Sequence, residues 1–290
     1  FMADIFRLDQ GKRLFGFIGV GGTLGGILGA AVTAGLAETL GPVNLLLISA
    51  ALLEVALRLV RQLGRRVTLT GLGAREDEEK AMGGGVLSGI KDAFRSPYLL
   101  GIIAFMFLFT FTSTAIYYQQ TDIATRSFTT PGAPAAFFAR IDLSVNILAV
   151  LTQAFLTGRI IKWFGLGVAL AILPLVTVVG LVGLGFAPTL GVLFAVQVVR
   201  RGWNYGLMKP ALETLYTVVP REEKYKAKNF IDTTVYRTGD QLGAWSNRGF
   251  MALGVSFAGM AFMAVPLAGI WLVTGLALGV AQRKRARELG

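Results

Sequence analysis

The residues that could do chemistry in this chain are charged and amide side chains inside apolar segments. Arg200 and Arg201 lie in the apolar segment 189–208. At about 100° per residue, one helix face of this segment carries Gln197, Arg201, Asn204 and Met208. An ionisable side chain at bilayer depth costs about 2.5–3.5 kcal/mol, so it is kept where a partner or a watery cavity receives it. The pattern indicates either a site for an anion or a structural pair with a buried acid.

A second apolar segment, 229–254, also contains charges. One of its helix faces carries, at helical spacing, Asp232, Tyr236, Gly239 and Gly243. The two glycines would let another helix approach closely. Arg237 and Asp240 are i,i+3 neighbours, which leaves two interpretations: they neutralise each other, or they serve a site.

The segment 137–158 repeats this pattern. Asp142, Asn146 and Gln153 fall on one face of the expected helix, which should line a cavity or face the packed interior. A carboxylate held away from water binds a proton more readily, so Asp142, Asp240 and Asp232 are candidates for a coupling-ion or proton site. The candidates for substrate binding are Arg201, Asn204, Arg200, Arg237, Gln197, Asn146, Gln153 and Tyr236.

Composition limits the chemistry of these candidates. The 290 residues include no His and no Cys, which removes disulfides, thiol nucleophiles, imidazole bases and thiolate or imidazole metal sites. We find no nucleophile motif or ATP-hydrolysing motif and expect neither catalytic residues, a metal nor a cofactor. A membrane-embedded enzyme is therefore disfavoured. With 54% apolar and 16% charged residues and a mean hydropathy of +0.62, the bilayer is the expected environment.

The elements that must position these residues are apolar helices. A helix needs about 20 mostly apolar residues to cross the hydrocarbon core, and strand-like alternation is absent. We predict an all-α membrane protein with eight transmembrane helices at 14–40, 42–60, 97–121, 137–158, 164–186, 189–208, 229–254 and 256–281. The glycines of the first segment, at small-xxx-small spacing, predict close helix packing rather than a phosphate-binding loop.

Most of the 28 Lys and Arg residues lie in alternate junctions between these segments, so both ends of this chain are expected to be cytoplasmic. Topology and lipid phosphate thus account for most of the net charge of +11, and a nucleic-acid partner is unnecessary. Pro210 lacks an amide hydrogen and crowds the carbonyl of Gly206, which predicts a bend below Arg201. Near it, Lys209 and Glu213 are expected to pair locally, as are Glu54 and Arg58.

The segments group into three regions. Residues 64–96 are polar, with an acidic run at 76–79, and predict a cytoplasmic linker. Residues 1–63 then read as two helices from a first bundle, and 97–290 as a complete six-helix bundle. A weak internal repeat at an offset of 214 residues supports this division, because it places Gly25 on Gly239 and Gly29 on Gly243. On this interpretation about four upstream helices of the same protein precede the chain, which looks N-terminally truncated.

A family resemblance rests on residues 200–205, on Lys209-Pro210, on residues 219–232 and on Tyr236-Arg237 with Gly239-Asp240. These motifs resemble bacterial major-facilitator-type proteins, in particular the group of nucleotide (ATP/ADP) exchange transporters. Residues 158–165 are similar in position to the facilitator loop motif. The resemblance implies a twelve-helix fold of two six-helix repeats, of which this chain would hold the last two helices of one repeat and all of the other.

These observations together favour a secondary-active transporter that works by alternating access in a bacterial inner membrane. Its expected partners are the lipid bilayer and a small anionic organic solute, for which a nucleotide is one candidate. The alternative is a non-transporting membrane scaffold or sensor, in which the charged positions are ties between helices.

Overall fold

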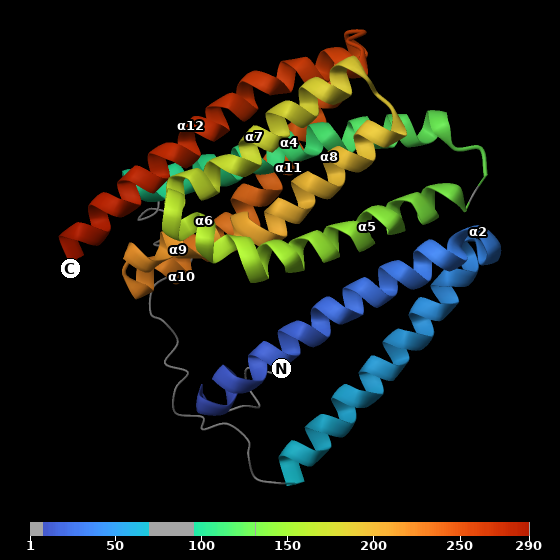
Figure 1. The fold of residues 1–290 in the computed structure, drawn as a ribbon, viewed down its shortest axis with the longest axis horizontal. Coiled ribbons are helices and arrows are strands. Elements are labelled where there is room, and N and C mark those ends of the chain that lie inside the picture. Colours follow the sequence, from blue (N-terminus) through green and yellow to red (C-terminus); the bar gives the residue numbers. More distant parts are fainter. Residues whose placement is uncertain (1–7, 70–95, 131, 290) are drawn as a thin grey trace. The chain divides into compact units, whose positions relative to one another are not determined.

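The computed structural model describes residues 8–69, 96–130 and 132–289, and within these ranges every regular element is a helix (Figure 1). In the described part of the chain, six helical segments are long and apolar enough to cross a membrane: Leu24–Gly41, Val43–Gln62, Pro97–Ser127, Ala133–Phe164, Leu166–Phe186 and Phe257–Glu288. They match six of the eight predicted spans. The remaining two, 189–208 and 229–254, are also helical in the structure, but they carry the charges discussed above and do not meet the same apolar criterion.

The described helices divide by their contacts into two units. The first comprises α2 (Leu8–Leu69) with residues 128–146, and the second comprises α4 (Pro97–Ser127) with the described residues from Ile147 onward. The helix α5 (Ala133–Leu151) contributes to both. Of the predicted linker, the part at 70–95 lies outside the described residues, while α2 extends to Leu69.

In the first unit, α2 is two helices joined at Gly41, as Figure 1 shows. Gly41 has φ 75° and ψ 160°, a conformation open to glycine because it has no Cβ. The i,i+4 pair of Glu54 and Arg58 is confirmed at 2.9 Å. The predicted close packing is not seen at Gly21, Gly25 or Gly29, where a Cβ would have no atom within 4 Å, but a Cβ at Gly26 would lie 3.4 Å from the side chain of Asn146.

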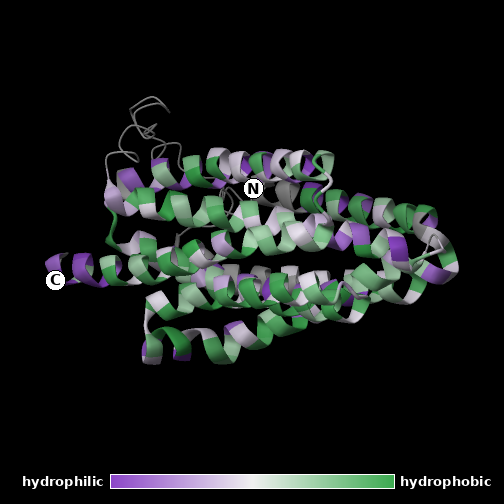
Figure 2. Cartoon of the chain, turned by 90° about the horizontal axis from the view of Figure 1, so that it is seen from above, coloured by the Kyte–Doolittle hydropathy of each residue, from purple (hydrophilic) through white to green (hydrophobic). Residues whose placement is uncertain are grey.

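In the second unit the chain continues from α5 through α6 (Thr157–Phe164), α7 (Leu166–Phe186), α8 (Leu190–Trp203), α9 (Lys209–Leu215), α10 (Arg221–Phe230), α11 (Tyr236–Ala252) and α12 (Phe257–Leu289). The helix α12 packs against both α7 and α4, and α11 packs against α4. Trp271 of α12 is fully buried, and its ring centroid lies 5.4 Å from that of Phe105 and 5.7 Å from that of Phe109. These aromatic side chains anchor α12 on α4. Figure 2 shows α12 as mainly hydrophobic along its length and hydrophilic at its C-terminal end.

The prediction that Gly239 and Gly243 admit a neighbouring helix is confirmed. That helix is α4: a Cβ at Gly239 would lie 1.9 Å from the hydroxyl of Thr110, and a Cβ at Gly243 would lie 3.0 Å from Cβ of Thr114. Glycine at these positions therefore permits the separation between α4 and α11, and this separation sets the width of the site described below.

Three π turns interrupt these helices, at Thr152–Leu156, Asn204–Met208 and Ile231–Val235. The second lies between Arg201 and Pro210, where a bend is predicted from sequence. Because Pro210 has no amide hydrogen, the carbonyl of Gly206 lacks its α-helical donor, and the hydroxyl of Thr157 donates to that carbonyl at 2.6 Å. A neighbouring helix thus supplies the hydrogen bond that proline removes.

The prediction that Lys209 pairs with Glu213 is wrong. Glu213 pairs instead with Lys228 of α10, at 2.5 Å, and the ammonium of Lys209 lies 4.6 Å from the ring centroid of Tyr205. The i,i+4 spacing brought the two residues onto one face, but each has a partner with better geometry nearby.

Candidate functional site

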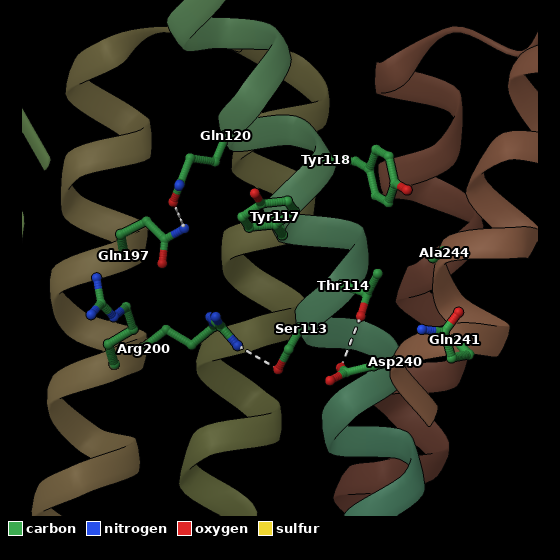
Figure 3. A pocket seen from close by; sticks show the side chains of 11 residues that line it. Ser113, Thr114, Tyr117, Tyr118, Gln120, Gln197, Arg200, Asp240, Gln241 and Ala244 are labelled. Atoms are coloured by element: carbon green, nitrogen blue, oxygen red, sulfur yellow. Dashed lines mark hydrogen bonds between the residues drawn. The ribbon is translucent and has the colours of Figure 1, made fainter. Parts of the chain in front are cut away.

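A cavity of about 570 Å³ lies within the second unit, between α4, α8 and α11 (Figure 3). It is lined by Ser113, Thr114, Tyr117, Tyr118 and Gln120 of α4, by Gln197, Arg200 and Arg201 of α8, and by Asp240, Gln241 and Ala244 of α11. Its volume falls within the range of about 300–1,000 Å³ typical of small-molecule sites. Most of the lining side chains are polar, which is unusual for a space between apolar helices.

Arg200 is the most buried charge in the cavity wall, with 8% of its surface exposed. One terminal nitrogen of its guanidinium donates to the hydroxyl of Ser113 at 2.9 Å, and its Nε is buried without a hydrogen-bond partner. Within the described residues, no carboxylate forms an ion pair with it. Because a buried charge is costly without a counter-charge, this guanidinium is suited to receive an anion.

Gln197 lies on the same helix as Arg200, about one turn earlier. It is 3% exposed, and its amide nitrogen donates to the side-chain oxygen of Gln120 on α4 at 2.5 Å. The side-chain oxygen of Gln197 is buried without a partner. The amide pair closes one side of the cavity and leaves an acceptor for a ligand donor or a water molecule.

Asp240 projects from α11, across the cavity from α8, as Figure 3 shows. Its carboxylate accepts a hydrogen bond from Thr114 of α4 at 3.2 Å. No direct ion pair joins it to Arg237 within the part of the chain that the structure describes, although the guanidinium lies close enough to act on the carboxylate electrostatically. The cavity therefore has a cationic wall on α8 and a carboxylate on α11.

Of the eleven residues proposed from sequence, the structure brings four to the cavity: Gln197, Arg200, Arg201 and Asp240. Asn204 begins the π turn that follows α8, and its side-chain oxygen is buried without a partner. On or just before α11, Asp232, Tyr236 and Arg237 are exposed and are not among the lining residues. The ring centroid of Tyr236 lies 6.3 Å from that of Phe109, in an edge-on contact.

None of the polar residues predicted in the segment 137–158 lines the cavity. Asp142 and Asn146 belong to the first unit and are half-buried, whereas Gln153 belongs to the second unit and is exposed. Gln153 lies in the π turn Thr152–Leu156, where the α-helical period used for the prediction no longer holds. Asn146 approaches α2, with its amide nitrogen 3.4 Å from the Cβ position of Gly26.

Sequence reasoning missed the contribution of α4 to the site. Ser113, Tyr117 and Gln120 lie at i, i+4 and i+7, a helical spacing that could have identified a polar face in this span. Within the described residues, no group of three acidic side chains is placed to hold a metal ion. The arrangement offers guanidinium and amide groups for an anion, a carboxylate opposite them, and two tyrosine rings.

The chain matches no protein-family model, and no curated protein is significantly similar to it.

Proposed function

We propose that this protein is a secondary-active transporter that moves an anionic organic solute across a membrane by alternating access, and that the cavity receives the solute. The observation that carries the proposal is Arg200, a buried guanidinium in the wall of a small-molecule-sized cavity with no carboxylate paired to it among the described residues. An anion would supply the missing counter-charge and accept the unused Nε hydrogen.

The proposal includes the finer architecture expected from sequence. In it, 189–208 and 229–254 cross the bilayer as helices alongside the six apolar ones, which gives eight spans of the major-facilitator type. Of their charged residues, Arg200, Arg201 and Asp240 face the cavity instead of lipid. The membrane would be a bacterial inner membrane, with the basic junctions on the cytoplasmic side. A nucleotide is one candidate solute, because its phosphates suit Arg200 and Arg201 and its base suits the rings of Tyr117 and Tyr118.

A membrane scaffold or sensor is the second candidate. The observation that favours it is that three cavity side chains form hydrogen bonds between helices: Arg200 to Ser113, Gln197 to Gln120, and Thr114 to Asp240. On this view the polar side chains hold α4, α8 and α11 together and bind no solute.

Uptake measurements on the full-length protein in proteoliposomes separate the two. The probes are radiolabelled ADP and, as a non-nucleotide anion, succinate. Arg200→Gln is expected to lower uptake of the transported probe by about 10- to 100-fold, because charge-assisted hydrogen bonds contribute about 1.5–3 kcal/mol each. Arg200→Lys should lower the uptake of this probe less than Arg200→Gln does, since lysine keeps the positive charge. Arg248→Gln removes an exposed arginine of α11 outside the cavity and is the control.

The thermal stability of each variant in detergent is measured alongside. The transport proposal fails if Arg200→Gln folds to the same yield and takes up the probe at the normal rate. It also fails, in favour of the scaffold, if the unmodified protein transports neither probe while Arg200→Gln strongly lowers the thermal stability.

A further inference from the structure

A second cavity of the second unit lies away from the proposed solute site, between the start of α4 and the end of α12. It has a volume of about 360 Å³. Its wall consists of Pro97, Tyr98 and Gly101 of α4 and of Thr274, Ala277, Leu278, Ala281, Lys284, Arg285 and Glu288 of α12. We call this cavity the α4–α12 groove.

The groove changes character along α12. Its first part is walled by Ala277, Leu278 and Ala281, and about one to two turns further on the wall becomes charged, at Lys284 and Arg285. At 1.5 Å per residue, the 33 residues of α12 extend over about 50 Å, whereas the hydrocarbon core is about 30 Å thick. The charged end of a spanning α12 therefore reaches the level of the lipid headgroups.

The basic side chains of the groove are placed for a ligand. Arg285 lies with its guanidinium carbon 4.6 Å from the ring centroid of Tyr98 and donates to the hydroxyl of Ser96 at 3.4 Å, so its position is fixed. Lys284 is exposed and pairs with no carboxylate in the described part of the chain. Glu288 is the one acidic residue of the wall, so Lys284 and Arg285 leave the wall with a net positive charge.

We infer that the α4–α12 groove binds an anionic phospholipid. Lys284 and Arg285 hold the phosphate, and one acyl chain lies along Ala277 and Ala281. Two properties argue for a lipid rather than a free phosphate: the apolar part of the groove is continuous with its basic part, and the change between them falls where the hydrocarbon core meets the headgroups. The inference depends on α12 spanning a bilayer and not on transport.

Native mass spectrometry of the full-length protein in detergent tests this inference. Phosphatidylglycerol is the probe, phosphatidylcholine is the zwitterionic comparison, and glycerol 3-phosphate is the headgroup without acyl chains. The unmodified protein should retain phosphatidylglycerol in preference to both. Lys284→Gln should weaken retention about fivefold, the effect of one basic side chain near a lipid surface. Ala277→Trp, at an exposed position in the groove wall, should weaken it by filling the groove.

Two matched controls lie on the same helix outside the groove. Arg287→Gln removes a neighbouring charge, and Val280→Trp adds the same bulk at a side chain that is 69% exposed. Both should retain phosphatidylglycerol as the unmodified protein does. Equal losses in all four variants, equal retention of phosphatidylcholine, or binding of glycerol 3-phosphate as tight as that of the lipid would each overturn the inference. Because retention is read without uptake, failure of the transport proposal would leave this result unchanged.

Discussion

The hydroxyl of Thr157 on α6 donates to the carbonyl of Gly206 at 2.6 Å, across two π turns that pack against each other. Gly206 is also closely covered, since a Cβ there would lie 2.7 Å from Cβ of Thr152. The contact joins the helix that contains Arg200 to the helix that contains Gln153. Pro210 removes the backbone donor that the Gly206 carbonyl would have in an α-helix. The π turn beside it and the Thr157 hydroxyl on the neighbouring helix accommodate this loss.

Replacing Thr157 should reveal this dependence. Thr157→Val keeps the shape of the side chain but leaves the Gly206 carbonyl buried and unpaired, so the free energy of unfolding in detergent should fall by about 1–3 kcal/mol. Thr177→Val is the matched control: Thr177 is fully buried, but its hydroxyl bonds only to the carbonyl of Leu173 in its own helix. Thr177→Val should lower the free energy of unfolding clearly less than Thr157→Val does.

A double variant sharpens the same test. Pro210→Ala restores a backbone donor for Gly206, so Thr157→Val should cost less in the Pro210→Ala background than in the unmodified protein. Additive losses in the double variant would show that the hydroxyl does not compensate for the proline.

The contact between α4 and α11 makes a second prediction. An alanine Cβ at Gly239 would overlap the hydroxyl of Thr110, which is itself fully buried, and would lie 3.1 Å from the carbonyl of Phe107. Gly239→Ala should therefore destabilise the protein by about 1–3 kcal/mol in thermal unfolding. Gly249→Ala, on the same helix with no atom within 4 Å of the new Cβ, should be neutral or stabilising by up to about 1 kcal/mol. A loss at Gly249 equal to that at Gly239 would attribute the effect to helix flexibility instead of packing.

The sequence predicted the helical fold and the shared helix face of two residues that line the cavity. Continuous apolar segments locate membrane-compatible helices, and the 100° period correctly grouped Gln197 with Arg201, because both lie before the first π turn of that helix. Gln153 lies within the π turn Thr152–Leu156, where the spacing of side chains departs from 100° per residue. The local sequence does not predict a π turn at residues 152–156, because the carbonyl that contacts Thr157 belongs to Gly206, 49 residues later in the chain.

The polar face of α4 could not be predicted from the sequence, for a different reason. Ser113 and Thr114 can satisfy their hydroxyls on their own helix, at the carbonyls of Phe109 and Thr110, so such residues are ordinary in an apolar span. Their second contacts, to Arg200 and Asp240, depend on which helices meet α4. Which helices meet α4 is decided by tertiary packing and not by the hydroxyl residues themselves. For α11, this packing depends on Gly239 and Gly243, which let α4 approach closely.

Asp240 provides the last prediction, which tests ion coupling. Its carboxylate shares the cavity with Arg200 and Arg201, so a proton taken up there would change the charge that an anionic solute meets. Asp240→Asn keeps an acceptor for Thr114 but cannot titrate; it should abolish accumulation of radiolabelled ADP driven by an imposed pH gradient, while ADP exchange without a gradient stays within about threefold of the unmodified protein. Asp122→Asn is the matched control, because Asp122 pairs with Arg126 at 2.7 Å outside the cavity wall. If Asp240→Asn accumulates ADP as fully as the control does, Asp240 is not the coupling site and its role is to hold α11 to α4 through Thr114.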